Sequence, residues 1–217
     1  DTLQARNNLA GAYRDAGRLD EAIPLHEQTL KDSTRVLGPH HPDTLVTRNN
    51  LASAYRDAGR LDEAVPLFEQ NLEDRTRILG PDHPETLVSR HNLAGAYRDA
   101  GRLEEAITLY EQTLEDYTRI LGRYHQSTHI SRIDLAYTFQ RAGMFGESIT
   151  QYKEIFEDYE ATLGRNHFKT RTLREKLASL YRAFGLSEEA TKLFEKQFAS
   201  GNAKHDGTDD PDREADN

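Results

Sequence analysis

Two adjacent polar residues recur in this chain at intervals of 42 positions, and most of them are asparagines. The members of this row are Asn7, Asn8, Asn49, Asn50, His91 and Asn92. An asparagine amide carries two N–H donors and one carbonyl acceptor, so a row of amides can pair with the backbone of an extended peptide whatever its sequence. The repetition is equally compatible with a scaffolding role, in which the amides connect one repeating unit to the next.

An arginine row recurs with the same interval and consists of Arg14, Arg56 and Arg98. Guanidinium groups can clamp carboxylates or phosphates with two parallel hydrogen bonds. An aspartate follows each arginine, however, at positions 15, 57 and 99. We therefore favour ordinary solvated ion pairs over anion binding, and such pairs contribute little each.

Histidine spacing raises the question of a metal site. His125 and His129 lie four residues apart and would share one helical face, and a histidine recurs once per repeat at positions 41, 83, 125 and 167. Neither a cysteine nor an H-E-x-x-H string accompanies them, and the repeat itself explains the recurrence. Nucleotide-binding glycine loops and the G-x-S-x-G motif are also absent from the sequence. We expect no metal, no cofactor, no catalytic residue and no enzymatic activity.

The chain copies itself every 42 residues. The first two segments agree at 32 of 42 positions and the second and third at 29 of 42. Such a period indicates stacked units that each depend on their neighbours to bury an apolar face. The expected repeats are 1–42, 43–84, 85–126, 127–168 and 169–200.

Each repeat is predicted to contain two helices. In the first copy, apolar residues recur at helical spacing up to Gly17, and again from Leu19 to Leu37 before Gly38. His41 and His83 stand where a helix cap is expected, each followed by a proline that suits the first helical position. Within the second copy, Leu51 and Tyr55 should face the junction between the two helices. The tyrosines of the second helices are expected to pack between helices, at positions 110, 117, 152 and 159.

Composition limits the partners. The 217 residues carry a formal net charge of -9, which argues against binding nucleic acids or anionic membranes. Without cysteine or a long apolar run, the chain is expected to be cytoplasmic, with no membrane span. Residues 201–217 contain six carboxylates and two cations but no large apolar side chain, which predicts a disordered acidic tail. Because it lacks an initiator methionine, we expect the chain to be part of a longer protein.

The repeated unit resembles the tetratricopeptide repeat (TPR). The resemblance rests on Leu9-Ala10 and Tyr13 in the first helix, Gly17 at the turn, and Ala22 followed by an aromatic such as Phe68 in the second. The 42-residue length and the strings RNNLA and LGP are similar to the kinesin-light-chain subtype. Copies four and five depart from the pattern, with Ile133-Asp134 and Glu175-Lys176 at the asparagine pair.

This resemblance implies an all-α, right-handed superhelical solenoid of about five repeats, whose first helices line a concave groove that binds a protein or peptide. The implied groove residues are Asn7, Asn8, Asn49, Asn50, His91, Asn92, Asp134, Arg14, Arg56, Arg98 and Tyr137. Gln140 and Arg182 continue the arginine row. Alternatives are a sensor or autoinhibitory arm of a signalling NTPase, and a structural spacer or self-association element. We expect a monomer, with end-to-end association as an option, and the arginine- and alanine-rich composition suggests a bacterial source.

Overall fold

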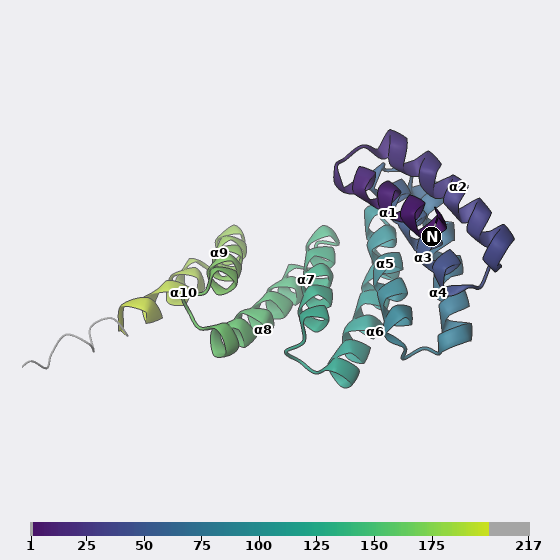
Figure 1. Cartoon of the computed structure of the whole chain (residues 1–217). Coiled ribbons are helices and arrows are strands. Elements are labelled where there is room, and N and C mark those ends of the chain that lie inside the picture. The colour runs from purple at the N-terminus through teal and green to yellow at the C-terminus, as the bar shows by residue number, and fades with distance from the viewer. Residues whose placement is uncertain (1, 200–217) are drawn as a thin grey trace, which may run out of the picture. The chain divides into compact units, whose positions relative to one another are not determined.

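The computed structural model describes residues 2–199, and in that range it contains ten α-helices and no strand (Figure 1). This confirms the all-α prediction, while the predicted acidic tail, residues 201–217, lies outside the described residues. The helices are α1 Thr2–Asp15, α2 Leu19–Leu37, α3 Pro42–Asp57, α4 Leu61–Leu79, α5 Pro84–Asp99, α6 Leu103–Leu121, α7 Gln126–Arg141, α8 Phe145–Leu163, α9 Phe168–Ala183 and α10 Ser187–Ala199.

Odd-numbered helices are the first helices of the repeats, here called A helices, and even-numbered ones are the B helices. Glycine sets their boundaries: Gly17 and Gly38 have φ angles of 74° and 96°. The second, third and fourth repeats have glycines with positive φ at both equivalent places, and the fifth has Gly185 at the first of them. A side chain with a Cβ rarely adopts this left-handed backbone, which ends a helix and turns the chain. The predicted glycine stops are confirmed.

Histidine caps the A helices. The backbone N–H of Asp43 donates to His41 Nδ1 at 3.2 Å, and that of Glu85 donates to His83 Nδ1 at 3.2 Å. His125 and His167 accept equivalent bonds at the starts of α7 and α9. An accepting side chain at this position satisfies one of the backbone donors that a helix start leaves unpaired. The once-per-repeat histidine is therefore a cap in all four places.

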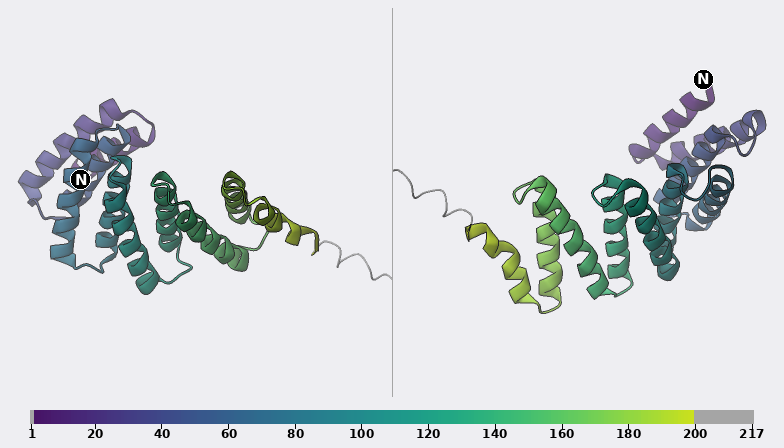
Figure 2. Two further views of the ribbon diagram at one scale, coloured as in Figure 1. Left: turned by 180° about the vertical axis from the view of Figure 1, so that it is seen from behind. Right: turned by 90° about the horizontal axis from the view of Figure 1, so that it is seen from below.

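The chain divides into two compact units, Asp1–Gln151 and Tyr152–Asn217. In the first unit each helix from α1 to α6 packs on the next, and neighbouring A helices also touch one another, α1 with α3, α3 with α5 and α5 with α7 (Figures 1 and 2). Leu51 and Tyr55 of α3 are buried in one cluster with Phe68 of α4 and Leu93 of α5. The predicted orientation of Leu51 and Tyr55 is thus confirmed.

The second unit has its own buried side chains. Tyr152, Ile155 and Phe156 of α8 are buried, as are Leu173 and Leu177 of α9. Helix α9 packs on α10. Buried Tyr152, together with Tyr110 and Tyr117 in the first unit, confirms the predicted packing role of these B-helix tyrosines, whereas Tyr159 is half-buried.

One buried position breaks the apolar pattern. His26 of α2 is fully buried at the place that Phe68 and Tyr110 occupy in the next two repeats. Neither of its ring nitrogens has a hydrogen-bond partner among the described residues. Burial, together with the positive charge of Arg14, lowers the pKa of His26 to about 4. A neutral imidazole therefore fills an aromatic site in the first repeat.

Candidate functional site

The A helices of the first unit share one accessible face. On α3 it consists of side chains spaced three or four residues apart along the helix, all exposed or half-buried, while the rest of the helix is largely buried in the array. These side chains are Val46, Asn49, Asn50, Ser53, Arg56 and Asp57. We call this surface, with the equivalent positions of α1, α5 and α7, the A-helix face. The repeat register places the eleven residues predicted from the sequence on it.

The asparagine row is bonded from repeat to repeat. Asn50 Nδ2 donates to Asn7 Oδ1 at 3.3 Å, and Asn92 Nδ2 donates to Asn49 Oδ1 at 3.0 Å. Each bond joins the second amide of one A helix to the first amide of the preceding one. Part of the hydrogen-bonding capacity of the asparagine amides is thus used to join neighbouring repeats. Among the described residues, Asn7 Nδ2 and Asn50 Oδ1 make no further hydrogen bond.

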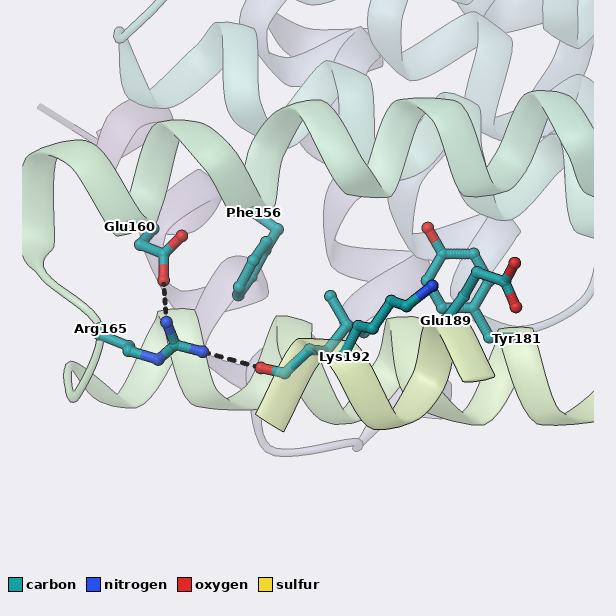
Figure 3. Close-up of a pocket in the computed structure, with 7 residues that line it drawn as sticks. Phe156, Glu160, Arg165, Tyr181, Glu189 and Lys192 are labelled. Carbon is teal, nitrogen blue, oxygen red and sulfur yellow. Dashed lines mark hydrogen bonds and ion pairs between the residues drawn. The ribbon is translucent and has the colours of Figure 1, made fainter. Parts of the chain in front are cut away.

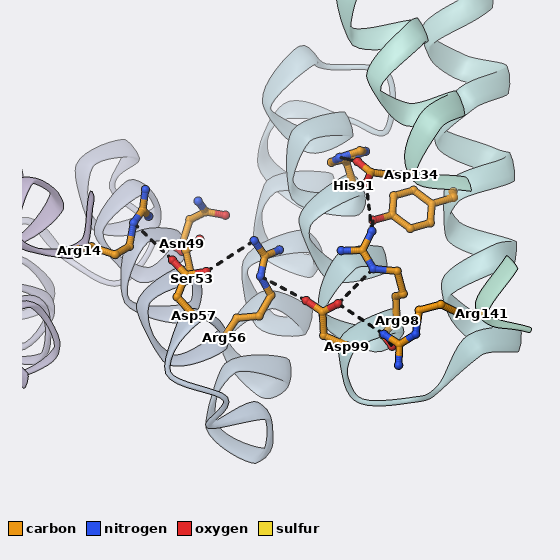
Figure 4. A network of polar contacts seen from close by, with 11 residues as sticks. Arg14, Asn49, Ser53, Arg56, Asp57, His91, Arg98, Asp99, Asp134 and Arg141 are labelled. Carbon is orange, nitrogen blue, oxygen red and sulfur yellow. Dashed lines mark hydrogen bonds and ion pairs between the residues drawn. The ribbon is translucent and has the colours of Figure 1, made fainter. Parts of the chain in front are cut away.

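The arginine row is also paired from repeat to repeat, but here the donor lies in the earlier repeat (Figure 4). Arg14 Nε lies 3.7 Å from Asp57 Oδ2, and Arg56 Nε lies 3.7 Å from Asp99 Oδ2, so each arginine reaches the aspartate of the next repeat. Arg14 also pairs with its own neighbour, Asp15, at 3.2 Å. The ion pairs expected within each Arg-Asp dipeptide therefore extend into a ladder that crosses the repeat boundaries.

The fourth copy reverses the charges of this ladder. Arg141 stands where the earlier repeats have aspartate, and its Nη1 lies 3.9 Å from Asp99 Oδ1 and donates to the carbonyl of Arg98 at 3.0 Å. Arg98, without an aspartate to reach at position 141, instead donates from Nη1 to Asp134 Oδ1 at 3.0 Å. Asp134 occupies the asparagine position of its repeat. The substitutions in copy four thus compensate one another.

His91 and Asp134 replace the amide pair at this junction. His91 Nε2 lies 3.2 Å from Asp134 Oδ2, and the imidazole meets the Tyr110 ring edge-on at 5.2 Å between centroids. Burial opposes ionisation of Asp134, but the hydrogen bond from His91 and the positive charge of Arg98 outweigh it and lower the pKa of this carboxyl. Asp134 is an anion that its own scaffold already neutralises.

Tyr137 differs from its equivalents in earlier repeats. It takes the place of Gly11, Ser53 and Gly95, is exposed, and lies beneath the Arg98 guanidinium, whose central carbon is 5.3 Å from the ring centroid. Gln140, half-buried, continues the arginine row on the same helix. The A-helix face therefore changes from small and amide side chains on α3 and α5 to aromatic and charged ones on α7.

A cleft opens on this face at the first repeat. It has a volume of about 130 Å³ and lies between α1, α2 and α3. Two predicted site residues, Asn7 and Asn8, contribute to its wall. The full lining is Leu3, Gln4, Asn7, Asn8, Ser33, Asp43, Val46 and Thr47. Amide and aliphatic groups thus meet in one concavity.

Another cavity, of about 230 Å³, lies within the second unit (Figure 3). Arg165 crosses one end, with Nη1 3.2 Å from Glu160 Oε1 and Nη2 donating to the Leu193 carbonyl at 2.9 Å. Phe156 and Tyr181 supply aromatic walls. Three of the charged lining groups, Glu160, Arg165 and Lys192, are paired within the protein, since Lys192 also pairs with Glu188 at 2.9 Å. None of the predicted site residues lies here.

A buried ion pair beneath the A-helix face was not anticipated from the sequence. Arg48 Nη1 donates to Asp74 Oδ2 at 2.6 Å, joining α3 to α4. Equivalent bonds join Arg6 to Asp32 at 2.7 Å and Arg90 to Asp116 at 2.6 Å. The signal was present as arginine and aspartate recurring 26 residues apart in successive copies.

Comparison with known proteins identifies the family. The tetratricopeptide repeat family model matches residues 1–73, 45–119, 89–161 and 127–197. The chain is a tetratricopeptide repeat protein. TPR arrays are generally non-catalytic scaffolds typical of protein–protein interaction. Among the described residues of this TPR protein, no cluster of three or more potential ligands could hold a metal ion, and no helix is long and apolar enough to cross a membrane.

Solved structures place the TPR protein beside the kinesin-light-chain-like subtype. Two crystal structures of nearly identical TPR-like repeats of a kinesin-light-chain-like protein from Podosopora anserina, one of them a variant with a single substitution, are 31% and 30% identical to it, with TM-scores of 0.80 and 0.81. These alignments cover 91% and 95% of this chain and 93% and 98% of those chains. A search of functionally curated sequences gave no match.

More distant structures share the fold alone. BtubC from P. vanneervenii is 18% identical with a TM-score of 0.74, over 99% of this chain and 85% of that one. A signal transduction ATPase with a TPR sensor from Pyrococcus horikoshii is 16% identical with a TM-score of 0.71, over 93% of this chain but only 30% of the ATPase.

Proposed function

We propose that the A-helix face of α1, α3 and α5 binds an extended segment of a partner protein. The observation that carries the proposal is the asparagine row, where amides from adjacent A helices lie within hydrogen-bond distance of each other yet keep polar atoms without a protein partner. A peptide backbone offers alternating N–H and C=O groups, which are the groups that such amides pair with. The cleft at Asn7 and Asn8 supplies a concave start for such a segment.

The proposed binding residues are those of the A-helix face. Asn7, Asn8, Asn49, Asn50 and Asn92 would bond the peptide backbone. His91 of α5, with Asp134 and Tyr137 of α7, would limit the segment at the junction of these two helices. Arg14, Arg56 and Arg98 would line one side of it. We further propose that the protein is cytoplasmic and works as a monomer.

The competing proposal is that the array is a structural spacer. The inter-repeat bonds of Asn50 and Asn92 favour it, because each contributes to the junction between two A helices. A spacer needs those bonds only for stability. A binding face also needs the amide groups that these inter-repeat bonds leave unpaired.

Replacing both Asn50 and Asn92 by alanine separates the two proposals. Peptides selected from a random 12-residue library on the wild-type chain should bind the double variant more weakly, by about 1–3 kcal/mol, because peptide amide groups lose their partners. Titration calorimetry and thermal melts on the same samples measure affinity and stability separately. A lowered melting temperature with intact peptide affinity would leave only the scaffold role, as would a library that yields no binder. The matched control is Gln70→Ala, which removes an exposed amide from the B helix α4, away from the asparagine row.

A further inference from the structure

The charges of the A-helix face cancel. Four arginines and four aspartates lie on it in the first unit, and each arginine is within 4.0 Å of at least one of the carboxylates. They are Arg14, Arg56, Arg98, Arg141, Asp15, Asp57, Asp99 and Asp134. An acidic ligand would have to displace a carboxylate that is already in place. The arginine row therefore does not present free cations to a partner.

The guanidinium groups are also partly covered. The side chains of Arg14 and Arg56 are 28% exposed, and that of Arg98 is 15% exposed. Near the starts of α3 and α5, by contrast, Asp43 and Glu85 are exposed carboxylates. These carboxylates and the net negative charge of the chain repel acidic partners further.

An aliphatic band runs beside the amides. Val46, Val88 and Ile130 occupy the same position in three successive repeats and are 38%, 45% and 44% exposed. Each precedes the asparagine position of its helix by three or four residues, so it lies one helical turn away on the same face. The self-neutralised ladder lies on the other side of the amides, toward the ends of the helices. Three bands therefore cross α3 and α5, in the order aliphatic, amide and ion-paired.

From this arrangement we infer that the segment bound on α1, α3 and α5 is uncharged and alternates aliphatic with neutral polar residues. The inference rests on the proposed function. Successive side chains of an extended segment point to opposite sides, so with its backbone on the amide band it would place one set against Val46 and Val88 and the other against the ion pairs. Neutral polar side chains can bond those ion pairs without competing for their charges.

Three labelled 12-residue peptides test the inference. They share aliphatic residues at alternate positions and carry Gln, Glu or Lys at the others. The Gln peptide should bind the wild-type chain at least about 10-fold more tightly than the Glu peptide and more tightly than the Lys peptide. Its affinity should change less than about 2-fold between about 0.05 and 0.5 M salt. Val88→Gln should weaken the Gln peptide several-fold. Preferential, salt-sensitive binding of the Glu or the Lys peptide, or an affinity of the Gln peptide that Val88→Gln leaves unchanged, would overturn the inference.

A gain of function provides the sharper measurement. Asp57→Asn combined with Asp99→Asn removes both carboxylates that Arg56 reaches, at 4.0 and 3.7 Å, and should raise affinity for the Glu peptide about 10-fold. Asp20→Asn with Asp62→Asn makes the same charge change on exposed B-helix positions and should not. Circular dichroism confirms that each variant is folded. An unchanged Glu-peptide affinity in a folded Asp57/Asp99 variant would show that the ladder does not set the preference.

The outcomes also separate the two proposals. The Glu peptide could bind the wild-type chain best and lose its affinity in the Asn50/Asn92 double variant. That result would overturn the inference that the segment is uncharged, but it would support binding at the asparagine row. Absence of binding by all three peptides and by the random library would overturn both.

Discussion

The Arg48 guanidinium donates to Asp74 Oδ2 at 2.6 Å between side chains that are only 5% and 10% exposed. The same carboxylate accepts from Arg77 at 3.0 Å and lies 3.2 Å from His40 Nδ1. Burial opposes its ionisation, but the hydrogen bonds from the two arginines lower the pKa of Asp74. One carboxylate thus joins α4 to α3 and to the loop before α3.

Removing this carboxylate should destabilise the array strongly. Asp74→Ala leaves the Arg48 charge buried without its partner, and we expect the free energy of unfolding to fall by about 3–5 kcal/mol. Urea denaturation followed by circular dichroism measures the loss. The control is Asp32→Ala, at the equivalent position of the first repeat. The side chains of Arg6 and Asp32 are 27% and 20% exposed, so this substitution should lower the free energy of unfolding by less. Equal losses at both sites would show that burial is not the deciding factor.

His26 should make the protein acid-sensitive. Well above pH 6.5 its imidazole is neutral in both the folded and the unfolded chain, so it contributes no pH dependence there. Between pH 6.5 and about 4 the unfolded chain binds a proton that the folded chain does not. The free energy of unfolding therefore decreases as the pH is lowered through this range, by up to about 3 kcal/mol. His26→Phe, which copies the residue at position 68, should flatten this part of the stability profile. A variant with the wild-type acid slope would rule out His26 as its source.

Tyr55 should be a large contributor to stability. Its ring is buried beside Leu51, the Arg60 guanidinium lies over it at 4.4 Å, and its hydroxyl donates to Glu27 Oε1 at 2.6 Å. Tyr55→Ala should cost about 3–5 kcal/mol as a core truncation, and Tyr55→Phe about 1 kcal/mol for the lost hydrogen bond. Thermal melts of both variants measure this. A melting curve unchanged in Tyr55→Ala would contradict the assigned packing.

Two glycines at equivalent helix positions should respond differently to alanine. A Cβ on Gly11 meets nothing within 4 Å, so Gly11→Ala should stabilise α1 by about 0.5–1 kcal/mol through helix propensity. A Cβ on Gly95 would lie 3.0 Å from Arg56 Nη1 and 3.3 Å from the Tyr110 hydroxyl. Displacement of Arg56 should offset the propensity gain. Comparison of the two melting temperatures tests this; an equal rise in both would show that Arg56 moves aside at no cost.

The sequence predicted the helices because their ends are marked by residues with strong local preferences. Gly17 and Gly38 tolerate the left-handed backbone, and His41 accepts a cap bond, so both signals act within a few residues of where they stand. The rows on the A-helix face followed from the repeat, which places equivalent residues at equivalent places. Long-range partners were less accessible. That Arg14 reaches Asp57 as well as Asp15 depends on how neighbouring A helices are packed, and a dipeptide pattern does not contain that information.

Two further features were hidden for different reasons. Arg48 and Asp74 lie 26 residues apart, and the same interval recurs in successive copies. Charged residues are so frequent on helix surfaces that this interval alone does not indicate an ion pair. In copy four, Asp134 and Arg141 replace the asparagine and the aspartate of the earlier repeats, which in the sequence resembles a loss of both rows. Only the contacts of Arg98 with Asp134 and of Arg141 with Asp99 show that the pattern was rewired.

The ladder also has a consequence for how this array can be lengthened or shuffled. Its regular steps join residues 43 positions apart, such as Arg14 with Asp57 and Arg56 with Asp99, so a duplicated 42-residue cassette inserted among the first three would find complementary neighbours on both sides. The rewired step is different, because Asp134 and Arg141 fit behind a unit that supplies His91, Arg98 and Asp99. The third and fourth cassettes therefore form an ordered pair, whereas the first two carry the same ladder residues and could exchange places without changing it. A recombination event that separated the fourth cassette from the third would leave a charge facing the wrong neighbour.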